Sequence, residues 1–319
     1  MKKSILILNE KYCDTKPELG LSNSFHNIIT SYAKSRNDNL FHVIHHDESL
    51  NLYGKHVDTF LLNYCIQYNI RAIIIMLAGG SPSNPSVETY QSLKDHGIHL
   101  SFFWPDSGLS PNYGILMAQE LSKFGLQYLW DNPCSPQHNA LPFNPKIIKL
   151  WVPQDLSFFY PSEQTIDVSF IGSSKYPDRT YFLSFLKGVA GFVSCGGQRE
   201  DMLGMDEYAK FIRSSKISIN FSLSLAQFYQ TKGRIFEIFA SKSMLLEYRN
   251  PSTSQLFEAG KDYIDFSEPK ELLDKINYYL YNEKERLDIA ESGYQKYMTH
   301  YTAKHYWDIV VENIENDKT

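Results

Sequence analysis

Short apolar runs alternate with amphipathic segments along most of the chain. A continuous apolar run bounded by polar turns predicts a strand buried on both faces, whereas apolar residues at every third or fourth position predict a helix. The first half therefore has the pattern of a doubly wound α/β domain. The expected strands are residues 4–8, 40–45, 72–77, 99–104, 126–130 and 147–152, and the expected helices are residues 24–35, 57–68, 86–96 and 113–123.

The alternation stops over residues 154–166, which contain Pro161 and little periodicity, and then starts again. We expect a linker there, between an N-terminal domain of residues 1–153 and a C-terminal domain of residues 167–319. Three helices with one apolar face each are expected between residues 269 and 316. In the second domain the expected strands are residues 167–171, 191–195, 217–221, 244–246 and 263–266, and the helices begin at residues 179, 206 and 232.

Composition narrows the classes of partner. A length of 319 residues suits two domains, and a net charge of −5 argues against a nucleic acid as the main partner and against a broad electrostatic membrane anchor. The first apolar run is too short for a signal peptide, and no segment has the roughly 18 apolar residues of a membrane span. The four cysteines lack CxxC spacing, so reduced thiols and a cytoplasmic location are expected.

The segment with the clearest chemistry is residues 231–247, TKGRIFEIFASKSMLLE. Lys232 and Arg234 lie in the first turn of an apolar helix, where free backbone N–H groups also attract phosphate. Glu237, one turn later, can accept hydrogen bonds from ribose hydroxyls. The alternative is a surface ion pair between Arg234 and Glu237, which stabilises little. A glycine such as Gly233 is unfavourable in a helix. Its presence in the first turn is easier to explain by the close approach of a ligand than by an ion pair.

Two further signals point to the same edge of the second sheet. Gly172 and Ser173 follow the strand at residues 167–171 and precede a helix that contains Arg179, while Asn220 lies at the end of the strand at residues 217–221. In open α/β sheets, ligands bind outside the carboxyl ends of the strands. We therefore expect Gly172, Asn220 and Lys232 to lie along one edge, with Ser173 and Arg179 as contacts.

Residues 167–302 resemble the donor domain of CgeB-like glycosyltransferases of the GT-B fold, through DVSFIGS, EYAKFIRSSKISINFS, KGRIFEIFAS and GKDYIDFSEPKELLDKI in this order. The resemblance implies two Rossmann-like doubly wound domains facing across a cleft, with C-terminal helices. The second domain would bind a nucleotide-diphosphate sugar such as a UDP-sugar, and the first a glycan or other small acceptor. The residues expected at the donor are Gly172, Ser173, Arg179, Asn220, Tyr229, Lys232, Gly233, Arg234 and Glu237.

Within this resemblance Glu237 would hold the ribose, and Lys232 and Arg234 would lie near the diphosphate. Two positions depart from the family. Tyr229 stands where many related enzymes carry a Glu that holds the sugar, and Lys242 stands where the family often has Gly. The expected activity is hexosyltransferase-like, and the alternative is a non-catalytic nucleotide-sugar-binding protein of the same fold. A nicotinamide-dependent oxidoreductase is disfavoured because no GxGxxG follows the first strand.

On the acceptor side, Asp106 follows the strand at residues 99–104 and is the candidate base for an inverting reaction, or else a turn-forming residue. Ser22 and Asn23 precede the first long helix and could contact acceptor or phosphate, or simply cap that helix. No DxD triplet is present, and adjacent side chains in the stretch His45 to Glu48 point opposite ways along a strand. We therefore expect no metal and no cofactor beyond the nucleotide-sugar co-substrate.

Overall fold

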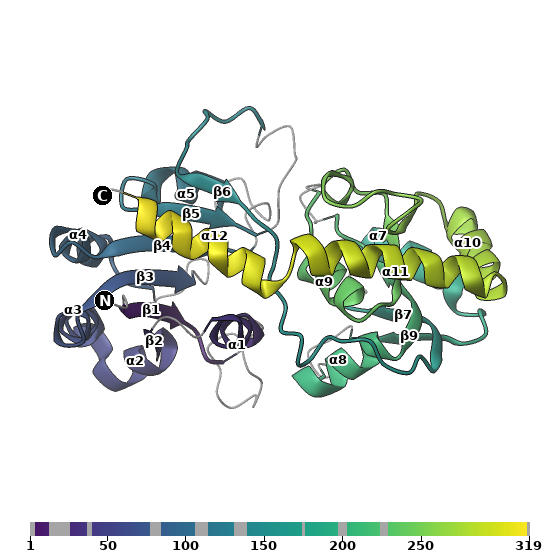
Figure 1. Ribbon diagram of the computed structural model, residues 1–319, viewed down its shortest axis with the longest axis horizontal. Helices are drawn as coiled ribbons and strands as arrows, with labels where there is room; N and C mark the ends of the chain where they lie inside the picture. Colours follow the sequence, from purple (N-terminus) through teal and green to yellow (C-terminus); the bar gives the residue numbers. More distant parts are fainter. Residues whose placement is uncertain are drawn as a thin grey trace. The chain divides into compact units, whose positions relative to one another are not determined.

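The computed structural model describes residues 4–12, 26–36, 40–76, 84–105, 114–130, 139–173, 176–196, 203–223 and 229–317. The chain forms two compact units, each a parallel sheet with helices packed on it (Figure 1). Unit 1 runs up to Val152 and includes the chain again from Ala303, and unit 2 is formed mainly by Pro153–Thr302. The predicted architecture of two α/β domains is confirmed.

The sheet of unit 1 has the strand order β2-β1-β3-β4-β5-β6, and every neighbouring pair is parallel. Its central strands are apolar on both faces, because helices cover both sides. Ile73, Ile75, Leu100 and Phe102 are fully buried in this core. The strands are β1 (Ser4–Asn9), β2 (Leu40–His45), β3 (Ile70–Met76), β4 (His99–Trp104), β5 (Leu126–Leu129) and β6 (Ile147–Lys149).

The last helix of the chain, α12 (Ala303–Asn316), packs in unit 1 against α1 (His26–Ser35). Trp307 is buried against Tyr32, with ring centroids 4.0 Å apart, and Trp130 donates a hydrogen bond to the hydroxyl of Tyr306. This differs from our assignment of residues 303–319 to the second domain. The buried face of α12 combines the aromatic Tyr306 and Trp307 with aliphatic residues, and its aromatic rings pack on those of unit 1.

The other helices of unit 1 follow the predicted order with one addition. Residues 46–53 form a helix that the sequence pattern did not predict, because HDESLNLY has few apolar residues and no clear periodicity. The helices are α2 (His46–Tyr53), α3 (Val57–Gln67), α4 (Val87–Asp95) and α5 (Ile115–Leu121), with a 3-10 turn, η3 (Gly54–His56), between α2 and α3.

Unit 2 has a five-stranded parallel sheet with the order β11-β10-β9-β7-β8. The chain passes from β7 outward to β8 and then returns across β7 to β9, so the direction of winding reverses between β7 and β9. Ligands bind at such a switch point, outside the carboxyl ends of the strands. The strands are β7 (Ile166–Ile171), β8 (Phe192–Cys195), β9 (Ser215–Asn220), β10 (Met244–Tyr248) and β11 (Ile264–Phe266).

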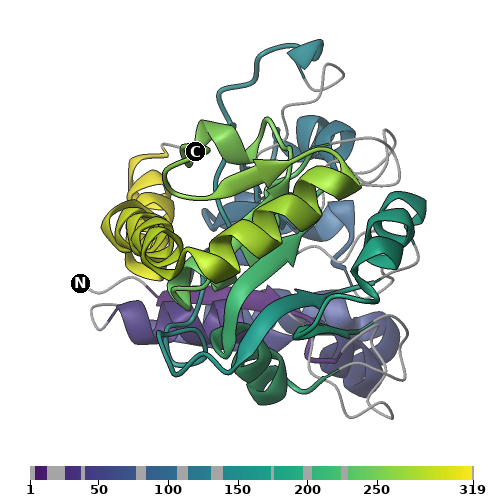
Figure 2. The ribbon, with the colours of Figure 1, turned by 90° about the vertical axis from the view of Figure 1, so that its right-hand side faces the viewer.

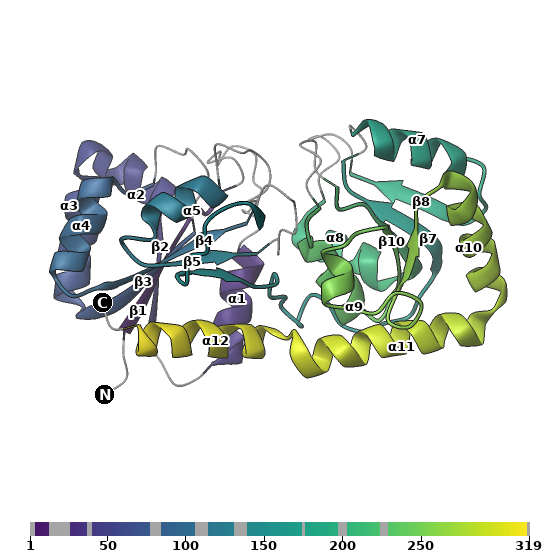
Figure 3. The same cartoon turned by 90° about the horizontal axis from the view of Figure 1, so that it is seen from above.

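Helices cover both faces of this sheet, as Figures 2 and 3 show. On one face α7 contacts α10, and on the other α9 contacts both α8 and α11. Within the described ranges, no helix combines the length and apolar character needed to cross a bilayer. The helices are α7 (Pro177–Leu186), α8 (Met205–Arg213), α9 (Gly233–Ala240), α10 (Pro269–Tyr281) and α11 (Glu283–His300), and η5 (Thr253–Gln255) is a 3-10 turn.

The expected linker at residues 154–166 packs into unit 2. Gln154 and Asp155 are buried, and Phe159 is fully buried. Asp155 closes a turn by accepting hydrogen bonds from the backbone N–H groups of Ser157 and Phe159. Gln154 donates to the carbonyl of Gly233 at the start of α9 (3.3 Å). The stretch lacks periodicity because it is an ordered loop, held by these contacts.

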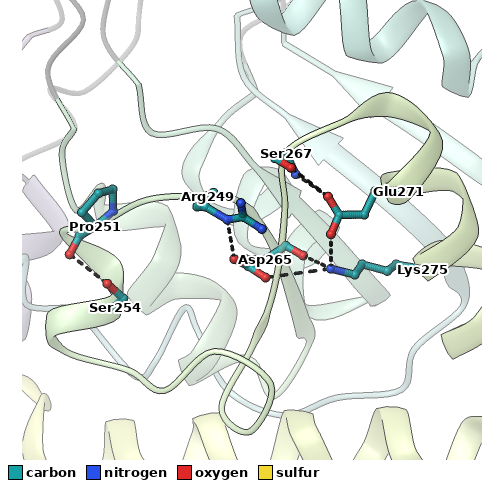
Figure 4. Close-up of polar contacts among 7 residues, drawn as sticks. All are labelled: Arg249, Pro251, Ser254, Asp265, Ser267, Glu271 and Lys275. Atoms are coloured by element: carbon teal, nitrogen blue, oxygen red, sulfur yellow. Dashed lines mark hydrogen bonds and ion pairs between the residues drawn. The ribbon is translucent and has the colours of Figure 1, made fainter.

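A polar network joins β11 to the first turn of α10 (Figure 4). Glu271 accepts hydrogen bonds from the backbone N–H of Ser267 (2.8 Å), from its hydroxyl (3.0 Å) and from Lys275 Nζ (2.7 Å). Lys275 Nζ also donates to the carbonyl of Asp265 (2.5 Å), whose carboxylate accepts from Arg249 Nε (3.0 Å). Burial alone would raise the pKa of Glu271, but the bonds from Lys275 and Ser267 outweigh it and lower the pKa to about 2.

We therefore expect Glu271→Gln to lower the free energy of unfolding by about 1 kcal/mol at pH 7, since solvent screens this half-buried group. A carboxyl whose folded pKa lies below its ordinary value of 4.5 stabilises the fold above that pH, and this stabilisation is lost as pH falls toward 2. Urea unfolding should show the difference at pH 7 and a smaller one at pH 3. Asp274→Asn, in an exposed pair with Lys270, is the control; a pH-independent difference for Glu271→Gln would refute this account.

Candidate functional site

Gly172, directly after β7, brings two parts of the site together. Its φ of +140° lies in the region that favours glycine, and a Cβ at this position would lie 2.9 Å from Arg234 Nη1. The backbone therefore favours glycine here, and a Cβ would displace the end of the Arg234 side chain. The loop after β7 and the first turn of α9 thus meet at the switch point of the sheet.

Helix α9 is short but is held firmly by its apolar residues. Ile235, Phe236 and Phe239 are buried, which fixes the helix against the sheet and places Arg234 in its first turn. Lys232 is the N-cap, with an extended backbone, and Gly233 is the first helical residue. The helix ends at Ala240, and Lys242 has a positive φ of 57°.

The Arg234 side chain is half-buried among polar groups. Its Nη1 lies 3.5 Å from Asn220 Oδ1, and its Nε lies 3.4 Å from the hydroxyl of Tyr208 on α8. Burial alone would lower the pKa of Arg234, but Tyr208 and Glu237 outweigh that effect and the pKa is raised. Both contacts are long for hydrogen bonds, so Arg234 keeps donor capacity for a stronger acceptor.

Glu237 lies one turn after Arg234 and is buried, with 9% of its surface exposed. The hydroxyl of Tyr208 donates a hydrogen bond to its Oε2. Burial raises the pKa of Glu237, while Arg234 and this hydrogen bond act in the opposite direction. A solvated surface ion pair of Arg234 and Glu237, the alternative drawn from the sequence, does not describe this buried arrangement.

Arg179, on α7, is a second guanidinium group at this edge, and it is buried. Its Nη1 donates to the carbonyl of Ser173 (3.1 Å) and its Nη2 to the carbonyl of Phe221 (2.9 Å), so it joins the loops that follow β7 and β9. Burial, with a further contribution from Arg234, lowers the pKa of Arg179 to about 10. Arg179 is still charged at neutral pH, and two like charges in a half-buried place are stabilised by a bound anion.

One buried acid at this edge, Glu247, was not among the predicted site residues. Glu247, in β10, is fully buried and pairs in register with Asn220 of β9. Asn220 Nδ2 donates to its Oε2 (2.8 Å). The only sequence signal was a charged residue directly after the apolar run of residues 244–246.

Part of the chain matches a known protein family. Residues 158–312 match the family model described as glycosyl transferase-like. The matched segment covers just under half of the chain. It contains the whole site described above. Comparison with the curated proteins finds no match.

The solved structures extend the comparison to both units. HepE from Anabaena, crystallised with UDP and glucose, has a TM-score of 0.64 at 11% identity, over 99% of this chain and 100% of that chain. A glycosyltransferase from Rickettsia africae has a TM-score of 0.58 at 12% identity, over 99% and 100% of the two chains. An α1,3-fucosyltransferase has a TM-score of 0.53 at 13% identity, over 99% and 92%. At such identities the likeness shows the fold, which is GT-B.

Not every predicted site residue can be placed in this GT-B chain. Asp106, Ser22 and Asn23 lie outside the described residues. Tyr229 forms an isolated antiparallel bridge with Leu223, and its carbonyl accepts a hydrogen bond from the hydroxyl of Ser252 (3.3 Å). Tyr229 therefore lies in the segment that leads into α9.

His46 and Asp47, just after β2, are buried in unit 1. The carboxylate of Asp47 accepts hydrogen bonds from the backbone N–H groups of Lys11 (3.0 Å) and Tyr12 (3.1 Å). Burial lowers the pKa of His46 to about 4, so this imidazole is neutral at physiological pH. Among the described residues, no group of three His, Cys, Asp or Glu side chains is arranged to hold a metal ion.

Proposed function

We propose that the chain is a glycosyltransferase that moves a sugar from a nucleotide-diphosphate sugar to an acceptor. The observation that carries this proposal is the convergence of Arg179 and Arg234 beside Gly172, at the switch point of unit 2. Two cations and the N-terminus of α9 suit a diphosphate. Glu237, one turn further along α9, suits the hydroxyls of a ribose.

The proposed mechanism follows from the charges. When the bond between sugar and diphosphate breaks, negative charge grows on the leaving diphosphate. Guanidinium groups already aimed at that position stabilise the transition state more than the ground state, because they need no reorganisation. Arg234 and Arg179 would supply the positive charge, so we propose transfer that does not depend on a metal. Asp106 remains the proposed acceptor-side base for an inverting reaction.

A UDP-sugar is the proposed donor class, and a hexose the proposed sugar. HepE, of the same fold, has been crystallised with UDP-glucose, with UDP, and with UDP and glucose. The motifs at residues 167–302 support a place among the CgeB-like enzymes. A glycan or other small molecule is the proposed acceptor, and the cytoplasm the proposed location.

A second candidate is a protein that binds nucleotide-sugars without transfer. Tyr229 favours it, because it stands where related enzymes carry a sugar-holding Glu. The two functions are separated by incubating the purified chain with a panel of UDP-sugars and possible acceptors. Release of UDP together with a glycosylated or hydrolysed product supports a glycosyltransferase. Tight binding of UDP-sugar without any turnover would instead support the binding protein.

The ribose assignment predicts a selective loss of affinity. Glu237→Ala should weaken UDP binding about 10- to 100-fold, the value of hydrogen bonds to a charged acceptor. It should change the affinity for 2′,3′-dideoxy-UDP far less, because that ligand lacks the hydroxyls that Glu237 would accept from. Titration calorimetry with both ligands measures the two effects.

Glu207→Ala provides the matched control, since Glu207 is an exposed acid on α8 of the same unit. Tyr208→Phe removes only the hydroxyl that holds Glu237 Oε2, and we expect a smaller loss with the same preference for the ribose ligand. If Glu237→Ala lost equal affinity for UDP and for its dideoxy analogue, Glu237 would not bind the ribose hydroxyls.

A further inference from the structure

Glu247 is a buried acid for which the proposed mechanism has no use. It lies in β10 with 0% of its surface exposed. Taking a carboxylate out of water is costly unless hydrogen bonds compensate it, so a fully buried acid beside a binding site calls for an explanation. Its hydrogen bonds lead in two directions, and both directions end at the donor site.

The first direction runs through Asn220 to Arg234. Asn220 Nδ2 donates to Glu247 Oε2 (2.8 Å) and to the hydroxyl oxygen of Ser222 (2.9 Å). An amide nitrogen has two hydrogens, so both are used in these bonds. The carbonyl Oδ1 of Asn220 is thereby turned toward Arg234 Nη1, 3.5 Å away. Glu247 thus decides which end of the Asn220 amide faces the guanidinium group.

The second direction runs through Asn250 to the segment before α9. Asn250 Nδ2 donates to the carbonyl of Gln230 (2.7 Å) and to the hydroxyl oxygen of Thr253 (3.0 Å), and it lies 3.3 Å from Glu247 Oε1. Its Oδ1 accepts from the backbone N–H of Ser252 (2.9 Å). Gln230 lies two residues before Lys232, the N-cap of α9. Because three acceptors share two hydrogens, Glu247 contributes a weaker, shared contact to the backbone that leads into the helix N-terminus.

We propose that Glu247 is a positioning residue of the donor site, which orients Asn220 toward Arg234 and holds the Gln230 segment at the start of α9. The proposal rests on the proposed function, because it assumes that Arg234 and the N-terminus of α9 meet the diphosphate. Glu247 itself touches no substrate. It acts through the two asparagine amides.

The ionisation state of Glu247 matters for this positioning role, because both asparagines present N–H groups to its carboxylate. Burial raises the pKa of Glu247 to about 7, although Ser222, Asn220, Asn250 and Arg234 act against it. A protonated carboxyl carries a hydrogen on one oxygen and no longer accepts both amides well. The orientation of Asn220 should therefore weaken as pH falls through about 7. The charged and titratable groups around Glu247 are Arg234 on α9, Arg179 on α7 and Tyr263 just before β11.

The test uses UDP-glucose, whose phosphates are both esterified and do not titrate near neutral pH. Glu247→Gln keeps the shape of the side chain but cannot accept from both amides. We expect its dissociation constant for UDP-glucose at pH 8 to be about 10-fold above that of the wild type, the value of one to two hydrogen bonds. Glu258→Gln, an exposed acid of the same unit, is the control.

The pH profile separates a positioning role from a merely structural one. Between pH 8 and pH 6, wild-type affinity for UDP-glucose should fall about 10-fold, whereas Glu247→Gln should show little of this dependence. Glu237 also has a raised pKa, but it is present in both proteins, so the difference between the profiles belongs to Glu247. The wild-type profile can be measured even if the variant does not fold.

A flat wild-type profile, or a Glu247→Gln variant with wild-type affinity and the same pH dependence, overturns the positioning role and leaves the proposed function intact. Failure of the wild type to bind UDP-glucose or any other UDP-sugar refutes the proposed donor class, and the positioning role with it. A weakened variant with a flattened profile, beside an unchanged Glu258→Gln, supports the proposal.

Discussion

Replacing Arg234 by Gln should lower kcat/KM for transfer from a UDP-sugar by about 1,000-fold. Hydrogen bonds from a guanidinium group to phosphate contribute about 1.5–3 kcal/mol to binding, and a donor aimed at charge that grows in the transition state is worth a further 10- to 100-fold or more. Arg234 also lies between Asn220 and Tyr208, so its loss disturbs both neighbours. Steady-state kinetics with a UDP-sugar measure the effect.

Ligand selectivity gives this prediction its sharpest form. Arg234→Gln should reduce the affinity for UDP much more than the affinity for uridine, because only UDP carries the diphosphate. Arg249→Gln is the matched control, since Arg249 is 60% exposed and pairs with Asp265 in the same unit. Losses of equal size for UDP and uridine in Arg234→Gln would show that Arg234 does not face the diphosphate.

Gly172→Ala should damage both the stability of unit 2 and its affinity for the donor. The positive φ of 140° strains any residue with a Cβ, at a cost of about 1–3 kcal/mol. The new methyl group would also lie 2.9 Å from Arg234 Nη1, so the guanidinium group must move away. We expect a lower midpoint of thermal unfolding and at least about 10-fold weaker UDP binding.

A second glycine of the same unit serves as the control. At Gly188 an added Cβ meets nothing within 4 Å, and the backbone has no positive φ. Gly188→Ala should therefore leave the unfolding midpoint and the UDP affinity close to those of the wild type. If Gly172→Ala behaved in the same way, the close approach of Arg234 to the β7 loop would not exist in solution.

Much of the fold could be predicted from the chain because parallel strands buried on both faces are nearly pure apolar runs. The predicted strand at residues 99–104 agrees with β4, and the strand at residues 40–45 with β2. Gly172, Asn220 and Lys232 were expected along one edge, since the carboxyl ends of parallel strands share it. The structure places Arg234, two residues after Lys232, beside Gly172 and Asn220.

Other features depend on packing between distant segments. The helix of Tyr208 was predicted, but nothing local says that this hydroxyl reaches Glu237 on α9. In the sequence, Glu247 is a polar residue at the end of an apolar run. Only its pairing with Asn220 shows that it lies inside the site. The helix at residues 303–316 carried a clear apolar stripe, yet a stripe does not say which unit it will cover.

Titration calorimetry of the wild-type chain with UDP and with uridine tests the central claim most directly, because that claim places a diphosphate beside Arg179 and Arg234. The account predicts one UDP site per chain, with an affinity at least about 100-fold above that for uridine, as two charge-assisted contacts imply. It also predicts that Arg234→Gln removes most of this preference. Equal affinities for UDP and uridine, or no binding of UDP, would contradict it.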